Sequence, residues 1–126
     1  MSGVPRCGVD LVKVPRIQQA IEKHGHAFLS KIFTAGEIEY CESHKHRKFE
    51  HYAGRFAAKE AFYKAISPAD ARIRFKNIEI KHLPNGAPEF FISPEEKKRL
   101  GLTESNPIAV SLSHDTDYAV AVVVIS

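Results

Sequence analysis

The sequence predicts one α+β domain over residues 1–126, with a helical first half and a β-rich second half. The length of 126 residues and the composition, 44% hydrophobic and 26% charged, suit a single globular domain with its own core. The longest helical periodicity lies before residue 67, whereas the segments after residue 72 contain most of the strand-like patterns. Separation of helices and strands along the chain is typical of α+β proteins.

The first half opens with a short strand and a helix. The stretch "RCGVDLVKV", residues 6–14, is rich in β-branched residues and is bounded by turn-forming residues. Pro15 is favourable in the first turn of a helix, and Ile17 and Ile21 follow it at helical spacing. Gly25 is a suitable end for that helix.

Two further helices are expected before the second half. Thr34 followed by Glu37 fits a capping box, in which each side chain accepts a hydrogen bond from the other residue's backbone N–H. The longest helical pattern, "HRKFEHYAGRFAAKEAFYKAI", covers residues 46–66. It should end at Ser67–Pro68, because the residue before a proline avoids the helical conformation.

The second half begins with a β-hairpin. Residues 74–83 alternate in polarity, with Phe75, Ile78 and Ile80 as the expected inward residues. Asn85–Gly86, between this run and the strand-like "PEFFIS", is a strong signal for a tight hairpin turn.

A short helix and a second hairpin complete the prediction. The stretch "SPEEKKRLGL" has Pro94 at its first helical position and Gly101 near its end. Two β-rich runs at residues 108–115 and 118–125 are joined by a tight turn. We expect both strands to be central in a mostly antiparallel sheet against which the long helix packs.

Charge and cysteine content favour a cytoplasmic protein without a nucleic acid or membrane partner. The net charge of +3 is spread along the chain and does not form the basic stripe typical of DNA-binding proteins. Cys7 and Cys41 lack metal-ligand spacing, which suits a reducing compartment. The N-terminal stretch lacks the long apolar region of a signal peptide, and the longest apolar run is too short to span a bilayer.

The long helix carries the first candidate functional residues. At about 100° per residue, Glu60 and Lys64 lie roughly 40° apart, and Ala53 and Ala57 fall in the same sector. This arrangement predicts a carboxylate and an ammonium above a floor of small side chains that leaves room for a ligand. The alternative is a solvated i,i+4 ion pair, worth about 0.2–0.5 kcal/mol.

Arg55 and Lys59 form a second pair on this helix. They also lie within about 40° of each other, so their like charges repel. A bound polyanion would relieve the repulsion.

Asp10 is the residue that gives Glu60 a partner. It interrupts the apolar run "GVDLV", where an unpaired carboxylate would be costly. Asp10 and Glu60 together would form a two-carboxylate oxygen site, and Mg²⁺ favours one or two carboxylates together with waters and phosphate oxygens.

The histidines allow two further hypotheses, hydrolysis and zinc binding. Ser113, His114 and Asp115 are adjacent on an extended chain, where successive side chains point in opposite directions, so they cannot converge as a hydrolase triad. The alternative for His114 is a strand-end histidine satisfied by a neighbour. His44, His46 and His51 lack a cysteine pair or an HExxH pattern, which favours a solvated basic loop over zinc.

The order of the motifs resembles that of the holo-acyl-carrier-protein synthases, the short class of phosphopantetheinyl transferases. The matching stretches are "GVDLVKVPRI", "FTAGE", "GRFAAKEAFYKA", "NGAPE" and "SLSHDTDYA". They extend from Gly8 to Val124. The resemblance implies the 4′-phosphopantetheinyl transferase fold, with this chain similar to one half of the long members, which contain two similar halves.

The resemblance also implies an activity and a set of site residues. Members of this family transfer the phosphopantetheine group of coenzyme A to a serine of acyl carrier protein and release adenosine 3′,5′-bisphosphate, with Mg²⁺ as cofactor, in fatty acid biosynthesis. The motifs assign Asp10 and Glu60 as metal ligands, and Lys64 as a contact of the coenzyme A phosphates. The remaining assignments are coenzyme A contacts at Arg55, Gly86, Pro88 and His114, and a carrier-protein contact at Arg16. Glu60 is the candidate base for the serine hydroxyl, either directly or through a metal-bound water, and the sequence leaves both routes open.

Short members of the family are homotrimers with active sites at the subunit interfaces. The resemblance therefore implies that Asp10, Glu60 and Lys64 come from one subunit and that Arg55, His114 and the Gly86–Pro88 turn come from its neighbour. The carrier protein is acidic, and the surplus of lysine and arginine would steer it to the site.

Two other functions remain as alternatives. A non-catalytic module could bind acidic proteins or nucleotides through the same basic residues. However, such a module gains nothing from Asp10 and Glu60 near the phosphates unless a metal joins them. A small RNA-binding protein is less favoured, because the chain lacks an aromatic and basic recognition motif.

Overall fold

The computed structural model describes residues 3–66 and 73–126. Its elements are β1 (Arg6–Lys13), α1 (Val14–His24), α2 (His26–Ile32), α3 (Ala35–Glu42), α4 (Lys48–Ile66), the 3₁₀ turn η1 (Phe75–Asn77), β2 (Ile78–His82), β3 (Pro88–Ile92), α5 (Pro94–Arg99), β4 (Ile108–His114) and β5 (Tyr118–Ile125). The α+β class and the long helix against an antiparallel sheet are confirmed. The predicted helix end at Ser67–Pro68 lies outside the described residues.

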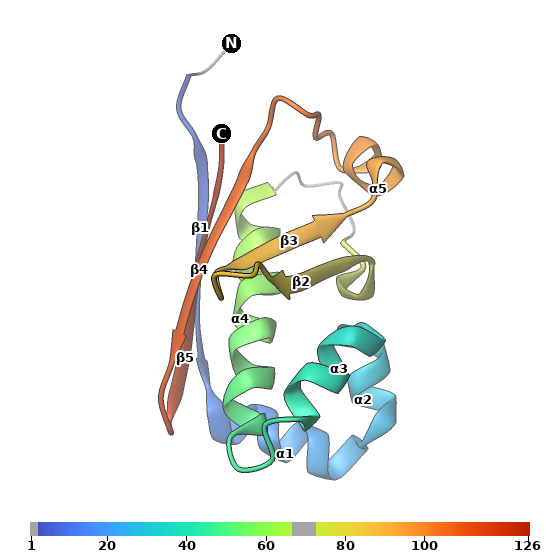
Figure 1. Ribbon diagram of the computed structural model, residues 1–126, viewed down its shortest axis with the longest axis vertical. Helices are drawn as coiled ribbons and strands as arrows, with labels where there is room; N and C mark the ends of the chain where they lie inside the picture. Colours follow the sequence, from blue (N-terminus) through green and yellow to red (C-terminus); the bar gives the residue numbers. More distant parts are fainter. Residues whose placement is uncertain (1–2, 67–72) are drawn as a thin grey trace.

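A three-stranded antiparallel sheet in the order β1-β5-β4 forms one side of the molecule, and α4 lies along its inner face (Figure 1). The prediction that both strands of the last hairpin are central is correct for β5 only. β5 pairs with β1 on one side and with β4 on the other, whereas β4 is an edge strand. The sequence pattern identified the hairpin but could not show that the first strand of the chain returns to pair with the last.

Gly8 allows β1 to lie directly against α4. A Cβ at Gly8 would come within 2.0 Å of the Ala61 carbonyl oxygen and 2.7 Å of the Ala65 backbone nitrogen. Both distances are far below van der Waals contact, so only glycine fits here without movement of the backbone. This close approach places Asp10, two residues further along the inner face of β1, beside α4.

The β2–β3 hairpin covers another side of α4, where the Phe62 and Phe90 rings are 5.1 Å apart. Its turn contains Gly86 with φ +89°, which confirms the predicted hairpin signal. Ile78 and Ile80 are buried as predicted, but Phe75 lies in η1 and is only partly buried. The strand therefore begins later than the alternation suggested.

The helices α1, α2 and α3 gather near the N-terminal end of α4 (Figure 1). The predicted capping box of α3 is present: Glu37 N donates to Thr34 Oγ1, and Thr34 N donates to Glu37 Oε1. Gly25, with φ +54°, ends α1 as expected, but the short helix α2 directly after it was not predicted.

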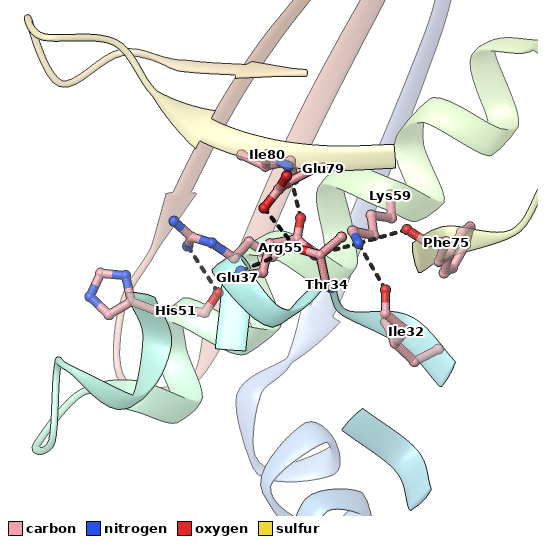
Figure 2. A network of polar contacts seen from close by, with 9 residues as sticks. All are labelled: Ile32, Thr34, Glu37, His51, Arg55, Lys59, Phe75, Glu79 and Ile80. Carbon is pink, nitrogen blue, oxygen red and sulfur yellow. Dashed lines mark hydrogen bonds and ion pairs between the residues drawn. The ribbon is translucent and has the colours of Figure 1, made fainter. Parts of the chain in front are cut away.

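A buried ion pair joins these helices to the hairpin (Figure 2). Lys59 donates to Glu37 Oε1, to the Ile32 carbonyl at 2.8 Å and to the Phe75 carbonyl at 2.7 Å. Glu37 also accepts a hydrogen bond from Ile80 N at 2.8 Å. Lys59 therefore has a carboxylate partner in the interior. We expected a bound polyanion to relieve the repulsion between Arg55 and Lys59, but the charge of Lys59 is balanced by Glu37 instead. Glu37 lies 22 positions away in sequence, so its proximity could not be seen from the helix alone.

The outer face of the sheet is exposed and largely apolar. Val9 and Leu11 on β1 are 56% and 65% exposed, and Tyr118, Val120 and Val122 on β5 are also exposed. The strand register places Val9 opposite Val122 and Leu11 opposite Val120, so these side chains form one continuous patch. Among the described residues, no helix is long and apolar enough to cross a bilayer.

Candidate active site

Asp10 and Glu60 face one hollow between β1, α1 and α4, with a cavity volume of about 450 Å³. Asp10 lies on the inner face of β1 because the strand alternates inward and outward side chains from Gly8 onward. Glu60 reaches the same hollow from the middle of α4. The predicted two-carboxylate pairing is therefore present, contributed by two elements 50 positions apart.

Lys64 lies beside this pair and contacts Asp10. Its Nζ donates to Asp10 Oδ1 at 2.9 Å and to the Val9 carbonyl at 3.0 Å, and its side chain is 51% exposed. The sequence allowed either a ligand site at Glu60 and Lys64 or a solvated i,i+4 ion pair between them. No such ion pair is formed among the described residues. Lys64 instead pairs across to the strand and remains accessible from solvent.

The electrostatics of the hollow favour a bound cation. Burial raises the pKa of Glu60 above its ordinary value, the charge of Asp10 raises it further, and Lys64 lowers it. Two carboxylates that repel one another in a half-buried hollow are stabilised by a divalent cation between them. Asp10 and Glu60 could supply carboxylate oxygens to such a cation, and carboxylates are ligands that Mg²⁺ prefers.

The small side chains of α4 were expected to line this hollow, but they do not. Ala53 and Ala57 are completely buried in the hydrophobic core. The floor-of-small-residues hypothesis is wrong, because the sector that contains Ala53 and Ala57 faces the protein interior. The small side chains let α4 pack closely against its neighbours, and Phe56 lines the hollow in their place.

A basic rim borders the hollow on the side of α1. Lys13 at the end of β1 and Arg16 in the first turn of α1 both line it, and both are exposed. Tyr118 of β5 completes this side. The geometry therefore places the predicted carrier-protein contact, Arg16, at the mouth of the hollow that contains the carboxylates.

Arg55 and His114 belong to a second cluster, away from this hollow. Arg55 is 1% exposed, with its guanidinium 4.1 Å from the centre of the Tyr40 ring. Its Nη1 donates to the His51 carbonyl at 3.3 Å, as Figure 2 shows, and its Nη2 lies 3.4 Å from His82 Nδ1. Its Nε is buried without a hydrogen-bond partner.

Aromatic contacts connect the histidines of the second cluster. The His44 and His51 rings are 4.1 Å apart, and the His51 and His114 rings are 4.8 Å apart. His82 stacks on Tyr40 at 4.7 Å. The expectation of a solvated loop is wrong for His51, because this side chain lies on α4 and packs against His114 of β4. His44 packs on the nearby Tyr40 and His51 rings.

The Gly86–Pro88 turn adjoins the second cluster, since Pro88 pairs with His82 in the β2–β3 ladder. His114 Nδ1 contacts Glu50 Oε1 at 3.1 Å, so it has the neighbouring partner that a strand-end histidine requires. Asp115 accepts hydrogen bonds from the backbone N–H groups of Asp117 and Tyr118 and thereby stabilises the turn between β4 and β5. These contacts confirm that Ser113, His114 and Asp115 do not form a triad.

A comparison with protein families shows to which family the chain belongs. A family model described as the 4′-phosphopantetheinyl transferase superfamily matches residues 6–123. The chain belongs to this superfamily. It is therefore an enzyme of the phosphopantetheinyl transferase class.

Similar proteins support this membership in sequence and in structure. A holo-[acyl-carrier-protein] synthase of Ruminiclostridium cellulolyticum is 45% identical over 120 residues, which cover 94% of this chain and 90% of the relative. That of Thermodesulfovibrio yellowstonii is 44% identical over 119 residues, with 94% and 96% covered. Among solved structures, the crystal structure of the Helicobacter pylori holo-[acyl-carrier-protein] synthase in complex with coenzyme A superposes with a TM-score of 0.81. The match covers 95% of this chain and 99% of that chain, and the two sequences are 31% identical. The phosphopantetheinyl transferase fold of this chain is thereby confirmed.

Three residues of the second cluster were not nominated from the sequence. The Tyr40 ring covers the Arg55 guanidinium, His82 contacts Arg55 through Nδ1, and Glu50 pairs with both Arg47 and His114. Only the position of His82, a few residues before the Asn85–Gly86 turn, offered a signal, because that turn carried a motif of the family. The other contacts depend on how α3 and β4 approach α4.

Proposed function

We propose that the hollow around Asp10 and Glu60 is the active site of a holo-acyl-carrier-protein synthase. The substrate coenzyme A donates its 4′-phosphopantetheine group to a serine hydroxyl of apo acyl carrier protein. The serine oxygen forms a bond to the phosphorus that carries the pantetheine. The pyrophosphate bond to the adjoining phosphate breaks, and adenosine 3′,5′-bisphosphate leaves. The modified carrier then enters fatty acid biosynthesis.

The observation that carries this proposal is the meeting of Asp10 and Glu60 in one hollow with Lys64 beside them. Asp10 and Glu60 would hold Mg²⁺ through their carboxylate oxygens. When bound, Mg²⁺ neutralises the charge that develops on the leaving phosphate. A binder of polyanions would have no use for two carboxylates at this place.

Glu60 accepts the serine proton, either directly or through a metal-bound water. Its half-buried position keeps it in reach of a substrate in the hollow. The exposed ammonium of Lys64 lies beside the site and can contact the phosphates. Lys13 and Arg16 at the rim attract the acidic carrier protein.

The second cluster belongs to the coenzyme A site of a homotrimer. Arg55, His114 and the Gly86–Pro88 turn lie together but do not line the hollow of their own subunit. A complete site therefore needs the carboxylates of one subunit and the second cluster of its neighbour. The exposed patch of Val9, Leu11 and the β5 side chains supplies an apolar surface for such an assembly.

A single domain over residues 1–126 and a cytoplasmic location complete the proposal. One core connects α4, both sheets and the N-terminal helices, which suits one cooperative unit. Cys7 and Cys41 are both free thiols, and free thiols are the usual state in a reducing compartment.

The test is a transfer assay with coenzyme A, Mg²⁺ and apo acyl carrier protein, read by mass spectrometry of the intact carrier. The expected product is heavier by one phosphopantetheine group, and it should be absent without Mg²⁺ or with Glu60→Gln. Circular dichroism of the variant controls for folding. Binding of coenzyme A without any transfer would contradict the proposal and favour a non-catalytic module. Full activity of Glu60→Gln would remove Glu60 from the mechanism.

A further inference from the structure

The carboxylate of Asp10 is held by a lysine of the long helix. Lys64 Nζ donates to Asp10 Oδ1 at 2.9 Å and to the Val9 carbonyl at 3.0 Å, so the ammonium is attached to β1 at two points. Glu60 lies one helical turn before Lys64 and forms no ion pair within the described ranges 3–66 and 73–126. Lys64 therefore pairs with the carboxylate of the strand and not with that of its own helix.

The two members of this ion pair differ in their freedom to move. The Asp10 side chain is 15% exposed, and its strand is held directly against α4 at Gly8. The Lys64 side chain is 51% exposed, and its flexible four-carbon stem lets the ammonium move without any change of the backbone. Exposed ion pairs are weak, because solvent screens the charges and the long side chain loses entropy. Lys64 can therefore leave Asp10 while Asp10 stays in place.

Lys59 on the same helix shows the contrasting case of a fixed lysine. Its ammonium donates to Glu37 and to two backbone carbonyls, and neither side chain of that pair is exposed. All three ammonium donors of Lys59 are thus used in the interior. Lys64 uses two donors, one of them on the Asp10 carboxylate, and remains accessible from solvent. Lys64 is thus placed to exchange one charged partner for another.

The charges of the three groups in the hollow do not balance. When both carboxylates are ionised, Lys64 offsets one of them, and the charge of Glu60 is left without a counter-ion. A divalent cation shared by Asp10 and Glu60 would balance both carboxylates. It would also place a positive charge beside the Lys64 ammonium, and like charges at so short a distance repel. The ammonium and a divalent cation are therefore competing partners of Asp10.

We propose that Lys64 is a displaceable counter-ion of Asp10, which gives up this carboxylate to a divalent cation and is then free to contact a phosphate. This inference rests on the proposed function, which places the cation and the phosphates in the hollow. It gives Lys64 two opposite effects within one site. The ammonium weakens the binding of the cation, because its contact with Asp10 must be broken, and it favours the phosphates once it is released. A lysine that only fastened β1 to α4 would support both.

The test is the binding of Mn²⁺ alone, without coenzyme A or carrier protein, measured from the electron paramagnetic resonance signal of free Mn²⁺. Mn²⁺ is a suitable probe because it accepts the same carboxylate and water ligands as Mg²⁺. We expect Lys64→Met to bind Mn²⁺ about three- to fivefold more tightly than wild type, which is the scale of a weak exposed ion pair that no longer has to be broken. Lys64→Arg keeps a cation that can pair with Asp10 and should bind within about twofold of wild type.

A matched variant separates this competition from a general effect of charge. Lys13→Met removes a positive charge from the same hollow, but Lys13 forms no ion pair with Asp10 in the part of the chain that the structure describes. Its gain in Mn²⁺ affinity should be smaller than that of Lys64→Met. Circular dichroism controls for the folding of each variant.

Wild type gives an independent measurement that needs no folded variant. In protein labelled with ¹³C-lysine, the Cε signal of Lys64 should shift as Mg²⁺ is added, because the side chain leaves Asp10. Its absence from the spectrum of Lys64→Arg assigns the signal. A Lys64 signal that stays unchanged while the cation binds would contradict the exchange of partners.

The outcomes separate this inference from the proposed function. Normal transfer together with a Lys64→Met variant that binds Mn²⁺ no more tightly than wild type would overturn the inference alone. A gain that Lys13→Met equals, or normal transfer by a protein that binds no Mn²⁺ with or without Lys64, would do the same. Absence of transfer by wild type, with no Mn²⁺ bound by wild type or by Lys64→Met, would overturn the proposed function and the inference with it.

Discussion

Lys59 on α4 and Glu37 on α3 form an ion pair in which neither side chain is exposed to solvent. Lys59 also donates to the Ile32 and Phe75 carbonyls, and Glu37 accepts from Ile80 N. The pair therefore joins five elements, α2, α3, α4, η1 and β2. Breaking a buried pair on one side leaves the other charge without a partner. We expect Lys59→Met to lower the free energy of unfolding by about 3–5 kcal/mol in urea denaturation.

The matched control for this prediction is Lys81→Met. Lys81 pairs with Glu79 at 4.0 Å on the surface, with 56% of its side chain exposed, and exposed pairs contribute about 0–1 kcal/mol. Equal effects of the two substitutions would show that the interior pair is not a major stabilising contact.

The close approach of β1 to α4 gives a second prediction. Gly8→Ala would place a methyl group 2.0 Å from the Ala61 carbonyl oxygen, so the strand must move away from the helix. Overpacking of this kind costs about 1–3 kcal/mol, measured by urea denaturation. Gly3→Ala, where nothing lies within 4 Å of the new Cβ, should leave stability unchanged. The displaced strand carries Asp10, so the Gly8→Ala variant should also require more Mg²⁺ for activity.

Substitution of Lys64 should change the activity of the protein and leave its stability almost unchanged. Its ion pair with Asp10 is half exposed, so Lys64→Met should change the free energy of unfolding by less than about 1 kcal/mol. Loss of a cation beside the reacting phosphates should lower the rate of transfer by about 10²–10³-fold. The exposed Lys98→Met on α5 serves as the control. A transfer rate within twofold of wild type for Lys64→Met would remove Lys64 from the site.

The apolar outer face of the sheet predicts the behaviour of the assembly. Leu11→Glu places a charge in the centre of the patch that Val9, Leu11 and the β5 residues form. Light scattering should show a trimer for wild type and a smaller species for the variant, and transfer should be lost with the trimer. Phe91→Glu, which alters an exposed apolar residue of the hairpin instead, should remain trimeric. A fully active monomer would contradict a site shared between subunits.

The depressed pKa of His51 predicts a stability loss in mild acid. Below about pH 6.5 the unfolded chain protonates this histidine, but the folded protein does not do so until about pH 4. Unfolding therefore takes up a proton in this interval, and the free energy of unfolding falls as the pH decreases from 6.5 to 4. Thermal unfolding at several pH values should show a steeper decrease for wild type than for His51→Phe. Parallel curves would mean that His51 titrates normally in the folded protein.

Local sequence signals predicted most of the elements, with α2 as an exception, and the meeting of Asp10 and Glu60 in one hollow. The capping box of Thr34 and Glu37, the Asn85–Gly86 turn and the long helix depend on neighbours within a few residues, and each is present. Asp10 was recognisable because a carboxylate in an apolar strand requires a partner. That partner proved to be Lys64 as well as Glu60.

The contacts that the sequence did not predict depend on packing between segments that are distant in the chain. The partner of Lys59 comes from α3, and the ring that covers Arg55 is Tyr40, also from α3. Neither contact follows from helical spacing, since both depend on how α3 docks against α4. The edge position of β4 has the same origin, because it depends on the return of β1 to the last strand.

The single helix α4 also sets the distance between the two binding regions of each subunit. His51 and Glu60 are separated by nine positions, or about 14 Å along an α-helix. A small inhibitor that occupies the carboxylate hollow of one subunit is therefore too short to reach the histidines of the same chain. In a shared site, fragments bound to the two regions would contact different subunits. Joining such fragments with a linker would then produce a compound that fastens one subunit to the next, and its potency would depend on whether the assembly is intact.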